Sequence, residues 1–228
     1  MSAEVQLGKD LEAMKFRVRH LIDAADSEGQ YSDAQFDELM SAIKELAEMT
    51  PLPDPLDHQD KVASPWRTLF ASFGPRHTAG KSLEHDTLMS FQSFNKFPKL
   101  PIRVTGLEQE IHAQTKEYNN IAYIRNPSGD AEAMLITRGE YADGSENRQR
   151  YEVTFRKVEL LSSDGRDEHA LREAFGLESD YPLSFEFAGK FHSDVAYCDD
   201  ELRINFGSVG GSYVLERLHH SGRSVSFK

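Results

Sequence analysis

The sequence predicts an α+β fold that is mainly β, in which a helical hairpin precedes an antiparallel β-barrel, or strongly curved sheet, of about eight or nine strands. Residues 1–50 repeat apolar side chains at the three- and four-residue spacing of helices. Residues 51–63 form a proline-rich link. Residues 64–228 carry short alternating runs between turn signals, with no regular βαβ alternation and a short helix near 167–175, which predicts the barrel domain.

The predicted hairpin consists of two amphipathic helices joined by a short break. Gly29 interrupts the apolar pattern, and Ser32 to Gln35 then reads as a capping box. We expect the two apolar stripes to pack on each other or on the sheet, and a partner-binding face is the alternative. The stripes are Leu7, Leu11, Met14, Val18, Leu21, Ile22 and Ala25, then Phe36, Leu39, Met40, Ile43, Leu46 and Ala47.

Prolines end the second helix and begin the predicted link. Pro51, Pro53 and Pro55 predict an extended segment that cannot continue a helix. The apolar run 66–73 is then a predicted strand, followed by a loop over 75–82. A further apolar set lies within 87–97 and meets Pro98.

The middle of the chain predicts strands separated by turns. Candidate strands cover 102–113, 119–125 and 131–138, with a turn at Asn126 to Gly129 and another at Asp143-Gly144. Tyr151, Val153 and Phe155 alternate, and the apolar phase then shifts, which predicts a bulge near Arg156-Lys157. A helix over 167–175 is closed by Gly176, and the strand that follows is expected to bend at Gly189.

The last predicted element is a hairpin with a glycine-rich turn from Gly207 to Gly211. Leu202, Ile204 and Phe206 share one face of its first strand, and Arg203 lies on the other face. Arg203 is therefore either a surface arginine or a buried one that pairs with a carboxylate and closes one end of the barrel.

Charge and composition restrict the possible partners. The 228-residue chain has a net charge of −12, and residues 1–50 hold eleven acidic against five basic residues. An acidic protein repels phosphate backbones over long range, so no nucleic-acid partner is predicted. The small basic cluster of Arg148, Arg150, Arg156 and Lys157 is interpreted as a solvated strand face.

The sequence offers little for catalysis or metal binding. Its one cysteine, Cys198, excludes an internal disulfide and a cysteine-rich zinc site, and no metal or cofactor motif is present. An enzyme acting inside the barrel would have Asp199, Asp200 or His192 as acid–base candidates, but no nucleophile and base can be paired from their spacing. The polar N-terminus lacks the features of a secretory signal, and no run reaches membrane-span length, which predicts a cytoplasmic protein.

Three motifs in order resemble the plastid lipid-associated protein (PAP)/fibrillin family: the link from Met49 to Pro55, the strand Ser64-Pro-Trp66-Arg67, and the hairpin Asp200-Glu-Leu202-Arg203-Ile204. The resemblance implies a lipocalin-like barrel whose base is closed by Trp66, with Arg203 as the hairpin arginine of the family. Ser64 and Phe206 depart from the family pattern, where glycine and arginine are usual. If a leader has been removed, the resemblance implies a plastid location.

The resemblance predicts a protein that binds or carries a small apolar molecule, such as a lipid or isoprenoid, with no cofactor and no catalytic step. Bulky side chains in a barrel of about eight strands either fill the interior or line a ligand cavity. The alternative is a structural or protein-interaction module that uses the acidic hairpin and has a packed barrel. The predicted ligand-contacting or barrel-closing residues are Trp66, Phe70, Phe155, Phe185, Phe187, Tyr197 and Arg203.

Overall fold

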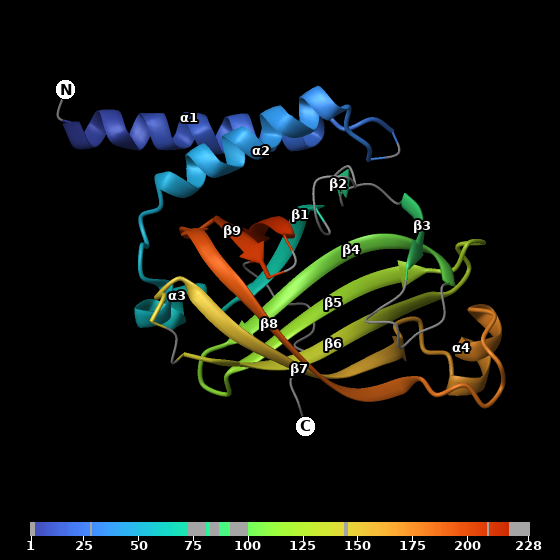
Figure 1. Ribbon diagram of the computed structural model, residues 1–228. Helices are drawn as coiled ribbons and strands as arrows, with labels where there is room; N and C mark the ends of the chain where they lie inside the picture. Colours follow the sequence, from blue (N-terminus) through green and yellow to red (C-terminus); the bar gives the residue numbers. More distant parts are fainter. Residues whose placement is uncertain are drawn as a thin grey trace.

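The computed structural model describes residues 3–27, 29–72, 81–82, 87–91, 100–143, 146–208 and 210–218 (Figure 1). The described helices are α1 (Ala3–Asp23), α2 (Asp33–Glu48), the 3-10 helix η1 (Pro55–His58), α3 (Gln59–Val62) and α4 (Glu168–Ala174). The strands are β1 (Pro65–Ser72), β2 (Lys81–Ser82), β3 (Thr87–Phe91), β4 (Leu100–His112), β5 (Glu117–Arg125), β6 (Glu132–Ala142), β7 (Arg150–Ser162), β8 (Ser184–Cys198), β9 (Leu202–Gly207) and β10 (Ser212–Arg217).

The strands form one antiparallel sheet that closes into an eight-stranded barrel. Its ten described strands have the order β2-β1-β10-β9-β8-β7-β6-β5-β4-β3, and β1 also pairs with β4. That pairing joins β1 to β4 and leaves the short strands β2 and β3 outside the ring. The predicted fold class is confirmed, and the nearly consecutive pairing follows from the short turns between neighbouring strands.

Local signals placed several elements correctly. Ser32 caps α2 in a full capping box with Gln35, and Asp167 caps α4, which ends before Gly176 at a φ of 67°. The register between β7 and β8 shifts between Phe155 and Lys157, at the predicted bulge. The predicted loop over 75–82 is wrong at its end, because Lys81 and Ser82 form β2 by pairing with β1. The rest of that loop, the run 92–97 and Gly144 lie outside the described residues.

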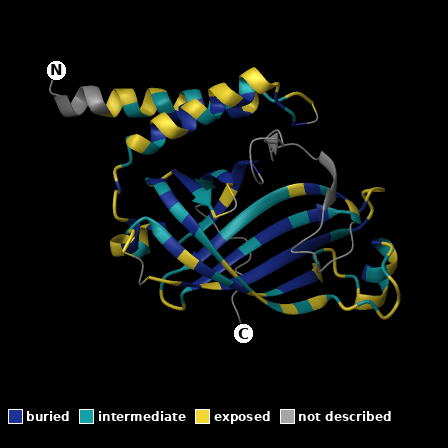
Figure 2. Cartoon of the chain, viewed as in Figure 1, coloured by how far each residue is buried: buried dark blue, intermediate teal, exposed yellow. Residues whose placement is uncertain are grey.

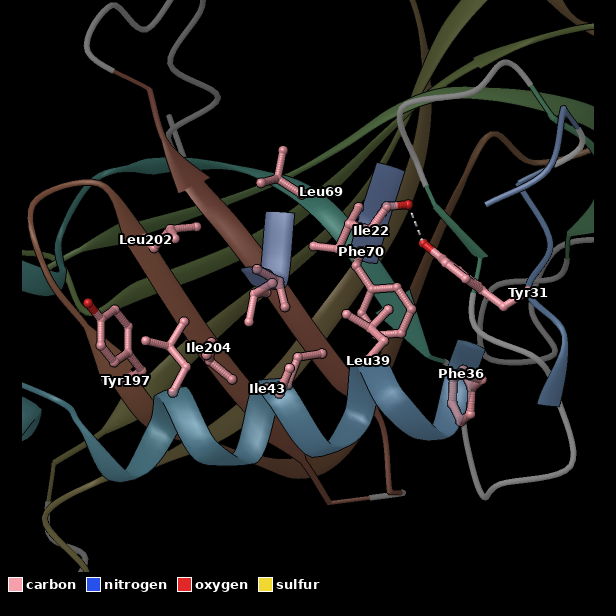
Figure 3. Packing of buried hydrophobic residues seen from close by; sticks show 14 residues of the cluster. Ile22, Tyr31, Phe36, Leu39, Ile43, Leu69, Phe70, Tyr197, Leu202 and Ile204 are labelled. Carbon is pink, nitrogen blue, oxygen red and sulfur yellow. Dashed lines mark hydrogen bonds between the residues drawn. The ribbon is translucent and has the colours of Figure 1, made fainter. Parts of the chain in front are cut away.

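The two long helices cover the outer face of one part of the barrel. Leu39 and Ile43 of α2 belong to one buried cluster with Phe70, Ile204 and other side chains of β1, β8, β9 and β10 (Figure 3). The Tyr31 hydroxyl donates a 2.8 Å hydrogen bond to the carbonyl of Ile22, which ties the inter-helix segment to α1. In Figure 2 the helices carry both exposed and buried positions, as expected of amphipathic helices packed on a sheet. No described helix is long and apolar enough to cross a membrane.

The link after α2 differs from its prediction. It is not extended throughout, because η1 and α3 occupy residues 55–62. Pro55 stands at the start of η1, where its missing N–H costs nothing and its fixed φ favours the helix. Leu56 and Val62 pack against Trp66 in one buried cluster, so this segment covers one end of the barrel, called the base below.

The basic cluster lies on the outer surface and is neutralised by acidic neighbours. Arg150 forms a paired contact with Asp194 at 2.7 and 2.8 Å. The other pairs are Arg148 with Asp57, Arg156 with Glu140 at 2.5 Å, and Lys157 with Glu159 at 2.6 Å. These pairs fit the interpretation of a solvated strand face.

Lys15 connects α1 to the turn between β8 and β9. Its ammonium lies 3.0 Å from Asp199 Oδ2, 2.7 Å from Glu201 Oε2 and 3.1 Å from Glu12 Oε1, and its side chain is 7% exposed. Burial opposes the charge on Lys15, but the hydrogen bonds that its ammonium donates to these carboxylates raise its pKa. Burial also opposes ionisation of Asp199, but hydrogen bonds from Tyr197 and from backbone N–H groups outweigh it and lower the pKa of Asp199.

Replacing Lys15 by methionine is expected to lower the free energy of unfolding by about 2–3 kcal/mol at neutral pH, because Asp199 loses its buried counter-charge. The lowered pKa of Asp199 gives stability that is present above its unfolded value of about 4 and lost as the pH falls below it. The difference between wild type and K15M should therefore shrink in acid. Urea denaturation from neutral to acidic pH measures it, and a difference independent of pH would contradict this account.

Candidate ligand-binding site

The closed barrel gives each strand an inner and an outer face, and the observed register assigns side chains to them. Paired residues on neighbouring antiparallel strands share a face. Trp66 pairs with Gln109 and Arg217, and Arg203 pairs with Leu215 and Cys198. These pairs lie on the inner face, opposite the surface covered by the two helices. The space enclosed by the inner face is called the lumen here.

The base of the lumen is tightly packed. The rings of Tyr141 and Tyr151 lie 4.8 Å apart, and the indole N–H of Trp66 donates a 2.9 Å hydrogen bond to the carbonyl of Val62. Burial raises the pKa of Tyr151, so its phenol stays neutral. Trp66, Ile111, Tyr118, Tyr151, Val195 and Leu215 are all buried. The predicted role of Trp66 at the base of the barrel fits this position.

Arg203 is fully buried at the base, beside Trp66. The centre of its guanidinium lies 4.7 Å from the centre of the indole ring, and that of Arg217 lies 4.4 Å from it. Its Nη2 donates to Gln109 Oε1, whereas its Nε and Nη1 have no partner. The prediction that Arg203 pairs with a carboxylate is wrong within the described part of the chain, because no carboxylate there forms an ion pair with it.

Polar side chains continue from Arg203 along the inner face. Gln109 Nε2 donates to Asn120 Oδ1 at 2.9 Å. Asn205 Nδ2 donates to Ser193 Oγ at 3.0 Å and to Gln109 Oε1 at 3.3 Å, while Asn205 Oδ1 has no partner. Gln109 and Asn120 are only partly buried, so they form a polar floor above the packed base.

Above this floor several inner-face side chains are partly exposed. An inner-face residue in the middle of a closed barrel touches water only if the interior holds space. Phe187 and Phe191 of β8 lie on the inner face, as does Leu107 of β4, and all three are partly exposed. Phe185 and Tyr213 are likewise partly exposed. The inner face above the floor is therefore mainly apolar and aromatic.

The pairing of β1 with β4, which closes the barrel, is short. These strands pair only at Pro65, Trp66 and Arg67, close to the base. Farther along, Phe70 and Ala71 pair with β2, while Leu100 to Val104 pair with β3. Each strand therefore takes a different partner beyond this short pairing.

Two glycines make room for the aromatic wall. Phe155 of β7 pairs with Gly139 of β6 on one side and with Gly189 of β8 on the other. A Cβ at Gly189 would lie 2.7 Å from Phe191 Cε2 and 3.0 Å from Phe187 Cε2. β8 continues through Gly189 without a break. The glycine allows ring packing.

Gly139→Ala is expected to lower the free energy of unfolding by about 1–3 kcal/mol, the cost of overpacking. Its Cβ would lie 2.7 Å from Phe155 Cδ1 and within 3.1 Å of two backbone carbonyl oxygens, which cannot move aside easily. Gly8→Ala is the control: nothing lies within 4 Å of that Cβ, and alanine favours the helix by roughly 0.5–1 kcal/mol. Chemical denaturation compares the two, and equal effects would exclude the steric explanation.

The predicted site residues divide between the two faces. Trp66, Phe155, Phe185, Phe187 and Arg203 lie on the inner face. Phe70 and Tyr197 instead lie on the outer face, in the cluster under α1 and α2. Gln109, Asn120, Leu107 and Phe191 were not among the predicted site residues. For Gln109 and Leu107, the two-residue alternation with Ile111 was the available signal.

The acid–base candidates do not meet at one point. Asp199 accepts from the backbone N–H groups of Glu201 and Leu202 in the turn before β9, and Asp200 is exposed. His192 pairs with Glu152 on the outer face of β7 and β8. Burial raises the pKa of the Cys198 thiol to about 11, so it is protonated at neutral pH.

A second hollow lies outside the lumen. It has a volume of about 590 Å³ and follows β6, β7 and β8, where Glu140, Glu152, Lys190 and His192 line it. The register places these charged side chains on the outer face. Tyr141, Val153 and Phe191 also line this hollow, so charged and apolar side chains both contribute to its wall.

Comparison with known proteins identifies the family. The profile of the PAP_fibrillin family matches residues 18–216, which span the end of α1, all of α2 and the barrel. The chain belongs to the PAP/fibrillin family. The resemblance expected from the link, the first strand and the terminal hairpin is thereby confirmed, and this PAP/fibrillin protein has the lipocalin-like barrel expected of it.

Other comparisons add less to this PAP/fibrillin assignment. A solved structure described as a selenomethionine derivative of a biogenic amine-binding protein matches with 11% identity and a TM-score of 0.32. The match covers 69% of this chain and 64% of that one, so this protein spans just under two thirds of its length. No curated protein matches the sequence.

Proposed function

We propose that this PAP/fibrillin protein binds and carries a lipid or isoprenoid-like molecule in the lumen of its barrel, without a catalytic step. The observation that carries the proposal is the partial exposure of inner-face side chains such as Leu107 and Phe187 above a closed base. Apolar, concave sites with a few polar groups are typical of small-molecule binding. Family membership supports the same reading.

The alternative function, protein interaction through the helical hairpin, has weaker support. The apolar side of the hairpin is already occupied, because Leu39, Ile43 and Leu46 are buried against the sheet. Phe16 of α1 is 72% exposed, but a single exposed ring is common on protein surfaces. The lumen is therefore the better candidate for a binding site.

Lipid carriage can be tested on the full-length protein with a variant that fills the lumen. Native mass spectrometry after incubation with lipid extract is expected to show one bound molecule. Leu107→Trp adds an indole on the inner face and should abolish that adduct. Leu161→Trp is the matched control, because Leu161 pairs with Met134 on the outer face and is 37% exposed. If wild type carries no lipid, or if both variants retain it equally, the proposal is wrong.

A further inference from the structure

The strongest unused feature of the lumen is a buried positive charge. Arg203 is fully buried, and arginine cannot lose its proton in proteins. Its Nε and Nη1 have no hydrogen-bond partner, although buried donors almost always have one. Leaving a charge buried without a counter-charge costs several kcal/mol, so its retention calls for an explanation.

No described neighbour balances this charge. The acidic groups that act on its charge are Tyr118, Cys198 and Tyr151, but burial raises the pKa of all three, so the phenols and the thiol remain neutral. The Asp199 carboxylate is held by Lys15 at 3.0 Å. The base of the lumen therefore carries a net positive charge from the guanidinium groups of Arg203 and Arg217.

The amide groups of the polar floor lie between this charge and the rest of the lumen. Gln109 Oε1 is occupied by Arg203 and Asn205, so the Gln109 amide presents its NH₂ group toward Asn120. Gln109 and Asn120 are both partly exposed. A molecule that touches the floor thus meets amide N–H donors with a positive charge behind them, and the best match is an anionic oxygen acceptor.

We propose that the carried molecule is an amphipathic anion whose carboxylate or phosphate head lies on the Gln109–Asn120 floor, with Arg203 behind it and its apolar part along the aromatic wall. This inference rests on the proposed function and names the chemistry of its ligand. The arrangement explains two facts together. The floor is the polar end of an otherwise apolar lumen, and the cation beneath it has no anionic partner among the described residues.

The test compares ligands that share a chain and differ in the head. Palmitic acid, cetyl alcohol and methyl palmitate are titrated into the full-length protein, and affinity is read by calorimetry. The acid is expected to bind at least about tenfold more tightly than the alcohol or the ester, which corresponds to roughly 1.4 kcal/mol. Palmitoyl lysophosphatidic acid is a fourth arm: tighter binding than palmitic acid assigns the head to a phosphate, and weaker binding assigns it to a carboxylate.

Two variants test the residues directly. Arg203→Met removes the charge and should reduce the acid-to-alcohol affinity ratio to about one, while a well-packed apolar replacement of a buried charge preserves or raises the melting temperature. Gln109→Glu supplies a carboxylate beside Arg203, and should also abolish the preference for acid while raising the melting temperature. Arg156→Met on the outer face is the control and should keep the wild-type ratio.

The outcomes separate the two proposals. Equal affinity of wild type for acid, alcohol and ester would overturn the anionic head and leave lipid carriage intact. Absence of binding by all four probes would overturn both. A preference for acid that survives in Arg203→Met, or in Gln109→Glu should the first variant not fold, would show that the head lies elsewhere.

Discussion

Removal of residues 1–50 is expected to leave a barrel that cannot hold its native structure. The hairpin covers Phe70, Ile204 and Val214, which are fully buried in the whole protein. Each large apolar side chain that becomes exposed costs roughly 1.5–3 kcal/mol. Several such side chains together exceed much of the total stability of a domain, which is about 5–15 kcal/mol.

Circular dichroism, limited proteolysis and binding of an apolar dye to the truncated chain measure this effect. We expect loss of near-ultraviolet signal, rapid proteolysis and strong dye binding. A truncated chain that stays folded and soluble would contradict the packing role, and would revive the hairpin as an appendage for partner binding.

A milder pair of variants localises the same effect. Leu39→Ala removes a fully buried side chain of α2 and should cost about 2–5 kcal/mol. Lys44→Ala changes an exposed position of the same helix and should stay within about 0.5 kcal/mol of wild type.

Trp66→Ala is expected to be the most damaging single substitution in the base, with a loss of about 3–5 kcal/mol in the free energy of unfolding. The indole is fully buried, donates to Val62, and lies against the guanidinium groups of Arg203 and Arg217. Its loss would leave a cavity beside an already unpaired cation.

Trp66→Phe separates the contributions of shape and contact. Phenylalanine keeps an aromatic ring for Arg203 but lacks the N–H that bonds Val62, so we expect a smaller loss than for alanine. Urea denaturation followed by far-ultraviolet circular dichroism measures both variants. Equal losses would show that the ring contributes nothing beyond the hydrogen bond.

The sequence was sufficient for elements whose signals are local. Helical spacing, the Ser32 capping box and the turn from Gly207 to Gly211 depend on residues close together in the chain. Alternation with Leu202 and Ile204 also placed Arg203 on the opposite face, which the register confirms. These features need no knowledge of distant partners.

Phe70 and Tyr197 show where alternation alone failed. Phe70 lies two residues after Thr68 in β1, and Tyr197 lies two residues after Val195 in β8. Because Thr68 and Val195 lie on the inner face, strict alternation predicts the inner face for both rings. Register shifts between Thr68 and Phe70, and between Val195 and Tyr197, insert one extra residue and reverse the phase. Both rings therefore point outward, and no local signal marks either bulge.

The polar floor could not be predicted for a different reason. Gln109 and Arg203 are 94 residues apart, and their contact exists only because β1 closes the ring against β4. Likewise, the absence of an ion pair between Arg203 and a carboxylate of the described residues depends on which strands surround it. Such long-range juxtapositions follow from barrel closure, which strand patterns alone do not specify.

The occupancy of the lumen is the central claim, and Trp66 allows it to be measured directly. It is the single tryptophan of the chain and lies at the base of the lumen. Parinaric acid, a fluorescent polyene fatty acid, should accept energy from Trp66 on binding, saturate at one molecule per chain and be displaced by palmitic acid. Energy transfer that is absent, or that neither saturates nor responds to palmitic acid, would contradict ligand binding inside the barrel.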